Sequence, residues 1–343
     1  MIKVAFLITK SEVGGAQSWM EQLTKLLEKD IDPIIITNQP GWLSTVLPNS
    51  LFYFVPEIER RVSLVALVKI SHILSLHRVE TVVASSANAG LYARILSLRQ
   101  SYKCVYVSHG WSCIYNGGKL KWIYSAVEFL LSMASDVVWC ISSSDYLKAK
   151  NIIKVPESKL RVAPNAVFPL KVNSSKDLID AKTLRLVCVA RLCPPKRFDL
   201  LIDAVSRLSD VDLTIVGGGS EYREMVSRTQ SPNICFLGEV AAFRDYAQFD
   251  AFILLSDSEG LPMSAIEAGS ARLPMILSNV GGCGELVNLD YPNGILVNNN
   301  EESVCNAVLD LKNRFSLYKL GAEAMVDKFD IRMYKSAYLS ILR

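Results

Sequence analysis

The chain has 343 residues, of which 50% are hydrophobic and 21% charged, and its formal net charge is +3. This balance excludes an intrinsically disordered chain, and the length predicts two domains rather than one core. No apolar run approaches the roughly eighteen residues of a membrane-spanning helix, and the run before Lys10 is too short for a signal peptide. We therefore expect a cytoplasmic protein.

The cysteine spacing and the charge distribution indicate which partners and metal sites are expected. The eight cysteines form no C-x-x-C pair and no metal-ligand spacing, which indicates reduced, mostly buried thiols. Residues 1–170 carry 18 Lys and Arg against 12 Asp and Glu. That excess fits an anionic partner such as a phospholipid surface, and ordinary surface variation explains it equally well. Neither a metal nor a nucleic acid is expected.

Apolar runs of strand length alternate with helical patterns in the first half of the chain. Strands are predicted at residues 3–8, 33–37, 51–54, 81–84, 103–107 and 137–141, and helices at 18–28, 64–76, 120–133 and 144–150. Because these strands are continuously apolar, the pattern predicts a parallel sheet covered by helices on both faces.

The second half repeats the pattern. Strands are predicted at 184–189, 213–216, 234–237, 251–255, 275–278 and 295–297, and helices at 198–208, 222–228, 263–270 and 301–315. Residues 162–182 contain residues that break helices and strands and show no hydrophobic periodicity, so we predict a linker there. We predict an N-terminal domain at 1–165, a C-terminal domain at 166–325, and a helix within 326–343 that can pack back on the first. Two doubly wound domains would leave a cleft between the carboxyl ends of their sheets.

A first candidate anion site follows the strand at 184–189. In "ARLCPPKRFDLLIDAV", Arg191 and Lys196 lie in a loop that leads into a helix. Backbone N–H groups and the helix dipole favour anions at such a junction, and two cations there suit a diphosphate. The alternative is two solvated surface charges. For Arg197 two interpretations are open, a third phosphate contact and a solvated charge, of which we favour the second.

Glycine-rich turns occur after two other strands. "LITKSEVGGAQSWM" places Gly14 and Gly15 at a helix start, where missing side chains would let backbone amides approach a phosphate or sugar. "TIVGGGSEYREM" ends a strand in three glycines that include Gly218. Neither domain's first strand ends in the dinucleotide fingerprint G-x-G-x-x-G.

The segment "SDSEGLPMSAIEAGSARLP" holds two glutamates eight positions apart. Glu259 lies in a loop and Glu267 in the second turn of the following helix. A carboxylate can hold vicinal hydroxyls, and the new helix start offers unpaired N–H groups for a phosphate. The pattern predicts a nucleotide sugar, with ribose and hexose at the two glutamates. The donor contacts expected here are Glu259, Gly260, Leu261, Pro262, Met263 and Glu267.

These motifs together resemble the retaining GT-B glycosyltransferases of family four. The resemblance covers the early Gly-Gly turn, "HGWS", "VAPNAV", "ARLCPPKRFDLLIDAV", "IVGGGSE", "LGEV" and the paired glutamates, in the family's order. It implies an α/β GT-B fold of two doubly wound, Rossmann-like parallel-sheet domains with an interdomain cleft. It also implies a bacterial surface-polysaccharide enzyme that needs no cofactor. Where the family usually has Gly, this chain has Ala190.

The resemblance also assigns roles. Arg191 and Lys196 would neutralise the donor diphosphate, Glu267 would hold the ribose, and Glu259 would contact the transferred sugar. His109, in "HGWS", would lie near the reacting carbon, although a lone histidine after a strand is structural about half the time. A UDP-sugar is favoured as donor, and a GDP-sugar remains open. The family implies retention of the anomeric configuration.

The acceptor would bind the N-terminal domain. "HGWSCIYNGGKLKWIYSAVEFLL" mixes aromatic and basic residues, which suits the cytoplasmic membrane face or a lipid-linked glycan acceptor. Acceptor contacts are expected at Trp111, Tyr115 and Lys119. "RRVSLVALVKISHILSLHR" is a second candidate, although an ordinary buried helix explains it better.

Three other functions remain open from the sequence. A GT-B nucleotide-sugar epimerase would share the cleft but need no acceptor. A Rossmann oxidoreductase would bind NAD, which the missing fingerprint disfavours. A non-catalytic sugar-binding protein would have a misplaced Glu259 or His109.

Overall fold

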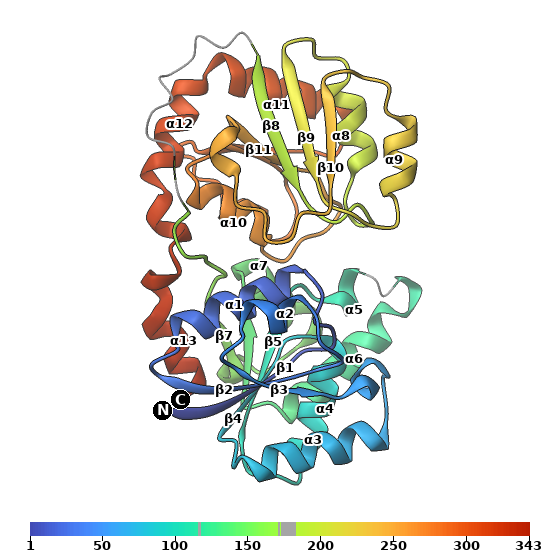
Figure 1. The fold of residues 1–343 in the computed structure, drawn as a ribbon, viewed down its shortest axis with the longest axis vertical. Coiled ribbons are helices and arrows are strands. Elements are labelled where there is room, and N and C mark those ends of the chain that lie inside the picture. Colours follow the sequence, from blue (N-terminus) through green and yellow to red (C-terminus); the bar gives the residue numbers. More distant parts are fainter. Residues whose placement is uncertain (116–117, 171, 173–182) are drawn as a thin grey trace. The chain divides into compact units, whose positions relative to one another are not determined.

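The computed structural model describes residues 1–115, 118–170, 172 and 183–343 of the chain (Figure 1). These residues form two compact units, each built around its own sheet. The N-terminal unit comprises Met1–Asn165 and Ile331–Arg343, and the C-terminal unit comprises Ala166–Asp330. Most of residues 171–182, in the predicted linker, lie outside the described residues. No described helix is long and apolar enough to cross a membrane.

The N-terminal unit is a seven-stranded parallel sheet in the order β3-β2-β1-β4-β5-β6-β7, with helices on both faces (Figure 1). Its strands are buried apolar runs, as the sequence predicts, apart from the partly exposed β3 and the short, unpredicted β7. The strands and helices are β1 (Ile2–Leu7), α1 (Gly15–Leu26), β2 (Ile31–Thr37), α2 (Trp42–Val46), β3 (Leu51–Phe54), α3 (Leu64–Leu76), β4 (Thr81–Ala84), α4 (Ala87–Ser97), β5 (Lys103–Ser108), α5 (Ser112–Tyr115), α6 (Lys121–Met133), β6 (Val137–Cys140), α7 (Ser143–Lys148) and β7 (Leu160–Val162).

The last helix, α13 (Lys335–Leu342), completes this N-terminal unit. Tyr338 packs on Trp139 of β6, with ring centroids 5.3 Å apart, and donates to the carbonyl of Pro164 at 2.6 Å. Trp139 in turn contacts Trp19 of α1 at 5.2 Å. Three buried aromatic rings thus join α1, β6 and α13. The return to the N-terminal unit begins at Ile331.

The C-terminal unit is a six-stranded parallel sheet in the order β10-β9-β8-β11-β12-β13. The predicted helix at 301–315 is two helices, because the chain turns between Asn313 and Phe315. The strands and helices are β8 (Leu184–Val189), α8 (Phe198–Val205), β9 (Val211–Val216), α9 (Tyr222–Arg228), β10 (Ile234–Gly238), β11 (Ala251–Leu254), α10 (Met263–Ser270), β12 (Met275–Ser278), β13 (Gly294–Val297), α11 (Glu301–Asn313) and α12 (Phe315–Ala324).

Strand order reverses once in each sheet, between β1 and β4 in the first and between β8 and β11 in the second. At such a switch point the loops after the two neighbouring strands leave in opposite directions, and open α/β sheets bind ligands there. In the C-terminal unit these two loops are residues 190–197 and 255–262. They are the loops that the sequence marks with Arg191, Lys196 and Glu259.

Candidate functional site: a nucleotide-sugar site

The two loops at the switch point of the C-terminal unit are joined by backbone hydrogen bonds. Arg197 donates its N–H to the carbonyl of Leu255 at 3.0 Å, and Asp257 donates to that of Pro195 at 2.8 Å. Lys196 and Ser256 form an antiparallel bridge. Because buried backbone groups need partners, this short ladder fixes one loop against the other. The loop after β8 and the loop after β11 therefore behave as one element.

Lys196 and Glu259 form an ion pair across this ladder. The Lys196 Nζ atom contacts the Glu259 Oε1 atom, and the two side chains are 18% and 10% exposed. The sequence assigns Lys196 to a diphosphate and Glu259 to a sugar, and the structure brings them into contact with each other. The ammonium has three donors and the carboxylate has four acceptor sites, so each can also bind a ligand while the pair stays formed.

Glycines at 281 and 282 support Glu259 from behind. Gly281 has φ +55°, and a Cβ atom there would lie 1.8 Å from the carbonyl oxygen of Glu259. Gly282 donates its N–H to the carbonyl of Gly260 at 2.8 Å. At position 281, only glycine allows both the positive φ and the close approach to the carbonyl oxygen of Glu259. The glycine-rich turn after β12 therefore positions the loop that carries Glu259.

Glu267 has two partners that the sequence did not indicate. Its Oε1 atom accepts from Arg244 Nη1 at 2.8 Å, and its Oε2 atom accepts from the Tyr246 hydroxyl at 2.8 Å. Tyr246 is fully buried, and burial together with the nearby Glu267 charge raises its pKa well above the usual value. Both contacts hold the carboxylate in one orientation. Arg244 and Tyr246 follow β10 with no distinctive spacing, so only the fold could reveal them.

The start of α10 presents backbone rather than side chains. Pro262 is the N-cap and gives no side-chain cap. Leu261 and Met263 on either side are 5% and 7% exposed, so their side chains belong to the core. Gly260 precedes them without a side chain. The N–H groups of this helix start are what a ligand could contact, as the sequence predicts for an anion.

A pocket of about 370 Å³ lies beyond the glycine loop that follows β9. A Cβ atom at Gly217 would lie 1.9 Å from the carbonyl oxygen of Ala190, and Leu192 donates to the carbonyl of Gly218 at 2.8 Å. The turn after β8, with the exposed Arg191, thus rests directly on the glycine loop. The pocket is lined by Gly218, Gly219, Ser220, Tyr222, Arg223, Gly238 and Glu239.

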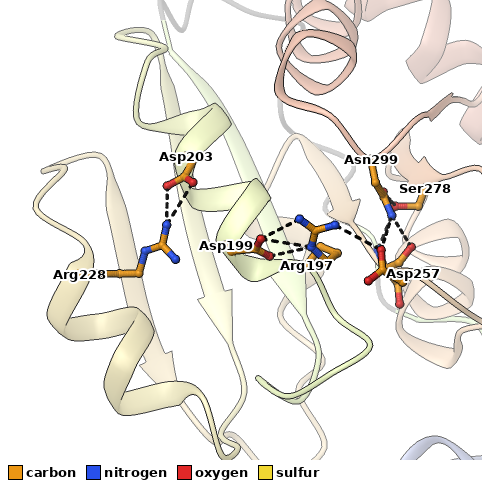
Figure 2. A network of polar contacts seen from close by, with 8 residues as sticks. Arg197, Asp199, Asp203, Arg228, Asp257, Ser278 and Asn299 are labelled. Carbon is orange, nitrogen blue, oxygen red and sulfur yellow. Dashed lines mark hydrogen bonds and ion pairs between the residues drawn. The ribbon is translucent and has the colours of Figure 1, made fainter. Parts of the chain in front are cut away.

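A second polar network braces the loop after β11 (Figure 2). Ser256 donates its N–H to Ser278 Oγ at 2.9 Å, and Ser278 Oγ donates to Asn299 Oδ1 at 2.5 Å. Asn299 Nδ2 then donates to the carbonyl of Ser256 at 2.9 Å and to Asp257 at 3.0 Å. The loops after β11, β12 and β13 are thereby joined two residues before Glu259.

Arg197 differs from the sequence interpretation. It is not a solvated single charge, because it pairs with Asp199 at 2.8 Å and with Asp257 at 3.4 Å (Figure 2). The Asp199 carboxylate raises the pKa of Arg197 above its usual value. Arg197 therefore links the start of α8 to the braced loop after β11.

In the N-terminal unit, His109 and the glycine turn lie on one edge of the sheet. The His109 ring packs edge-on against Trp19 of α1, with centroids 5.0 Å apart. Trp19 lies one helical turn after Gly15, and Gly14 is the N-cap without a side-chain cap. Burial lowers the pKa of His109 to about 4, so its ring is neutral at pH 7. Its Nε2 atom has no hydrogen-bond partner among the described residues.

The three predicted acceptor residues are placed differently from one another. Trp111 is 2% exposed and donates its ring N–H to the carbonyl of Asp145 at 2.9 Å, so it is part of the core. Tyr115 is half-buried, and the Lys148 ammonium lies 4.7 Å from its ring centre. The side chain of Lys119 lies outside the described residues.

Comparison with known proteins identifies this arrangement. The family model "Glycosyl transferases group 1" matches residues 183–314, which include the paired loops and both glutamates. The O-antigen biosynthesis glycosyltransferase WbnH of Escherichia coli is 40% identical over 343 residues, covering 100% of this chain and 99% of the relative. The chain belongs to the group 1 glycosyltransferases.

Two further similarities bear on this group 1 glycosyltransferase. An Escherichia coli protein named UDP-Gal:alpha-D-GlcNAc-diphosphoundecaprenol alpha-1,3-galactosyltransferase is 25% identical, covering 90% of this chain and 87% of its own. The crystal structure of Anabaena Alr3699/HepE in complex with UDP and glucose matches with a TM-score of 0.83 at 19% identity, covering 99% of this chain and 100% of that one. The second match confirms the predicted GT-B fold.

The described residues around the group 1 glycosyltransferase motifs include no cluster of metal ligands. Within the part of the chain that the structure describes, no group of three His, Cys, Asp or Glu side chains could hold a metal ion. Asp210 and Asp212, which flank the start of β9, lie at the amino end of that strand, opposite the switch-point loops.

Proposed function

We propose that this glycosyltransferase moves a hexose-type sugar from a nucleoside-diphosphate sugar to a lipid-linked glycan acceptor during bacterial O-antigen synthesis. The observation that carries the proposal is the Lys196–Glu259 pair at the switch point, next to the start of α10. It combines a cation for phosphate, a carboxylate for sugar hydroxyls and a helix N-terminus for an anion. WbnH, an O-antigen glycosyltransferase by name, supports the pathway.

The donor roles follow from these contacts. Arg191 and Lys196 neutralise the diphosphate, assisted by the backbone of residues 260–263 and the Gly14–Gly15 turn. Glu267 accepts from the ribose hydroxyls, and its contacts with Arg244 and Tyr246 orient the carboxylate for this role. Glu259 accepts from hydroxyls of the transferred sugar. The pocket beside Gly218 takes the base.

UDP is the nucleotide that the comparisons favour. The structure of Anabaena HepE holds UDP and glucose, and the name of the galactosyltransferase relative specifies UDP-Gal. That second name also specifies a diphosphoundecaprenol-linked acceptor, which supports a lipid-linked acceptor for this chain. An enzyme with such an acceptor would work at the cytoplasmic face of the membrane. A GDP-sugar is the alternative donor.

Catalysis is proposed to be electrostatic and to need no metal. The acceptor oxygen bonds to the anomeric carbon on the face from which the diphosphate leaves, so the configuration is retained. The acceptor's proton passes to an oxygen of the departing diphosphate. Arg191, Lys196 and the start of α10 stabilise the negative charge that develops on that group. His109 is proposed to assist the reaction from the N-terminal unit, with its ring neutral at pH 7.

Nucleotide-dependent thermal stability tests the donor site. UDP and UDP-glucose are expected to raise the unfolding midpoint of the wild-type protein, whereas GDP and NAD are not. Arg191→Gln is the sharpest variant, because this exposed side chain can be replaced without loss of stability. We expect it to weaken UDP binding about tenfold, which corresponds to one lost charged contact. Stabilisation by NAD alone would indicate an oxidoreductase instead.

The reaction itself is tested with a synthetic diphosphoundecaprenol-linked sugar as acceptor. NMR of the product should show the anomeric configuration of the donor. A changed nucleotide sugar formed without acceptor would indicate an epimerase. A trapped covalent glycosyl–enzyme adduct would contradict the single-step, front-face transfer. Nucleotide binding without any turnover would indicate a non-catalytic sugar-binding protein.

A further inference from the structure

Helix α6 of the N-terminal unit buries polar side chains and leaves large apolar side chains exposed. The two side chains that it buries are Ser125 and Ser132, and Glu128 between them is nearly buried. These residues follow the i, i+3, i+7 spacing of one helix face. Helix α3 on the same unit differs, because it buries the apolar side chains of Ala66, Ile70, Ile73 and Leu74, although it also exposes Leu64, Val65, Val68 and Leu76.

Polar contacts hold α6 against the rest of the unit. Glu128 forms an ion pair at 2.8 Å with Arg94 of α4, whose side chain is 1% exposed. Arg94 also donates to the carbonyl of Gly90 at 2.9 Å and lies 4.0 Å above the Tyr106 ring. Ser97 donates to the carbonyl of Ala134 at 2.9 Å, just after the end of α6. The two fully buried side chains of α6 are thus polar, whereas most of its large apolar side chains are exposed.

The outer face of α6 concentrates exposed apolar surface. Trp122 is 70% exposed and Leu130 is 66% exposed. Eight large apolar residues within fourteen positions are between 36% and 70% exposed, which exceeds the single exposed residues that are normal on a soluble surface. The members are Leu120, Trp122, Ile123, Tyr124, Val127, Phe129, Leu130 and Met133. We call this set the α6 face.

Charge around the α6 face is one-sided. Glu128 is the one acidic residue between positions 112 and 135, and its carboxylate is turned inward onto Arg94. Lys121 is exposed at the start of the helix, and Leu98 and Arg99 are exposed beyond the end of α4, close to Ala134. The exposed Asp136 follows the end of the helix, where Lys159 also contacts the carbonyls of Met133 and Ser135. An apolar helix face with Trp and Tyr and mainly cations at its margins matches the interfacial zone of an anionic bilayer.

We propose that α6 is a membrane-docking helix that lies in the plane of an anionic lipid surface and buries the α6 face among the acyl chains. A second copy of the chain is a poorer occupant, since a two-fold contact would bring the same cations together without an acid to pair them. The link to catalysis rests on the proposed function, because a lipid-linked acceptor lies at that surface. The docking itself does not depend on it.

Sedimentation with lipid vesicles tests the proposal without any enzymatic assay. The full-length protein should bind vesicles that contain phosphatidylglycerol, bind less as salt rises, and bind weakly to pure phosphatidylcholine. Trp122→Ser with Leu130→Ser should lower partitioning at least about tenfold. Lys121→Gln with Arg99→Gln should remove the salt dependence. Because all four side chains point outward, the unfolding midpoint should stay unchanged.

Matched controls separate the α6 face from general hydrophobicity. Leu289→Ser and Leu320→Ser remove apolar side chains that are 89% and 66% exposed in the C-terminal unit, and they should not alter vesicle binding. Trp122 is 70% exposed and Trp42 is half-buried, whereas Trp19, Trp111 and Trp139 are buried. Brominated lipid should therefore quench part of the fluorescence in wild type and not in Trp122→Phe.

The outcomes distinguish this proposal from the proposed function. Unchanged vesicle binding in the double serine variant would overturn membrane docking by α6, as would a dimer that the same variant dissociates. Neither result would affect UDP binding. Conversely, loss of UDP binding with normal vesicle binding would contradict the donor site and leave the docking intact.

Discussion

The loops at the two switch points are held together by different kinds of contact. In the C-terminal unit the loops after β8 and β11 are joined by backbone hydrogen bonds, and their charged side chains pair with one another, as Lys196 does with Glu259. In the N-terminal unit the loops after β1 and β4 are joined by side-chain hydroxyls, since the Thr9 N–H donates to Ser86 Oγ at 3.2 Å and the hydroxyls of Thr9 and Ser86 lie 2.6 Å apart. Charged side chains therefore pair across the C-terminal switch point, whereas neutral hydroxyls join the loops at the N-terminal one.

This difference predicts where stability and binding are coupled. Removing a member of a buried charge pair leaves the other charge unpaired, so changes in the C-terminal edge should cost folding free energy as well as affinity. Changes at the N-terminal switch point should cost less, because removing a neutral hydroxyl there leaves no unpaired charge behind. The experiments below test that asymmetry, from the largest expected effect to the smallest.

The largest effect is expected for Lys196→Ala or Glu259→Ala. Each single variant should lose about 3 kcal/mol of unfolding free energy, because it leaves a largely buried partner charge alone. Urea denaturation measures the loss. The double variant should lose less than the sum of the two, which a double-mutant cycle reveals. Strictly additive losses would mean that the two side chains do not interact in solution.

Gly281→Ala should be the next largest. The added Cβ meets the carbonyl oxygen of Glu259 and the backbone has φ +55°, so we expect a loss of about 2 kcal/mol and weaker UDP binding. Gly14→Ala is the matched variant in the N-terminal unit. Its Cβ would meet only the end of the flexible Gln17 side chain, so its stability should hardly change. Equal losses would contradict the proposed asymmetry.

Asn299→Ala should remove the side-chain hydrogen bonds that hold the loop before Glu259. Loss of its hydrogen bonds to Ser256 and Asp257 should cost about 1–2 kcal/mol, and the affinity for UDP-glucose should fall more than the affinity for UDP, because the loop that carries Glu259 is released. Calorimetry with both ligands provides the measurement. Asn298→Ala changes an exposed neighbour and serves as control. Equal losses for both ligands would point to a purely structural role.

The smallest effect is expected for the contribution of His109 to the pH dependence of the unfolding free energy. Burial lowers its folded pKa to about 4, whereas an unfolded histidine titrates near 6.5. Between these values the unfolded chain binds a proton that the fold does not, so stability falls as the pH drops from 6.5 to 4. His109→Phe should reduce the loss between pH 7 and pH 5 by on the order of 1 kcal/mol. An unchanged pH profile would show that the ring is accessible to protons.

Much of the fold could be predicted because its cause is local. Continuous apolar runs marked twelve of the thirteen strands in the described residues, since a strand buried on both faces leaves no room for polar residues. The missed strand, β7, has three residues, of which only Leu160 is buried. The break between α11 and α12 was also missed, since Arg314 supports helix on propensity alone and only the tertiary fold turns the chain there.

The site was less predictable, because it depends on contacts between distant segments. The loop positions of Arg191, Lys196 and Glu259 followed from strand–helix order. The contact between Lys196 and Glu259 did not, since 63 residues separate them. Arg244 and Tyr246 had no signal at all. For α6, the sequence indicated an amphipathic aromatic segment, but only the fold shows that its serines face inward.

The N-terminal unit is discontinuous in sequence, and this affects the order in which it can form. Its helix α13 leaves the ribosome only after the whole C-terminal unit has been synthesised. Until then, Trp139 lacks Tyr338, the Thr81 hydroxyl lacks the carbonyl of Leu342, and a face of the sheet is uncovered. The first unit to be translated is therefore the last to be completed, and an isolated fragment of residues 1–165 would carry an open apolar surface.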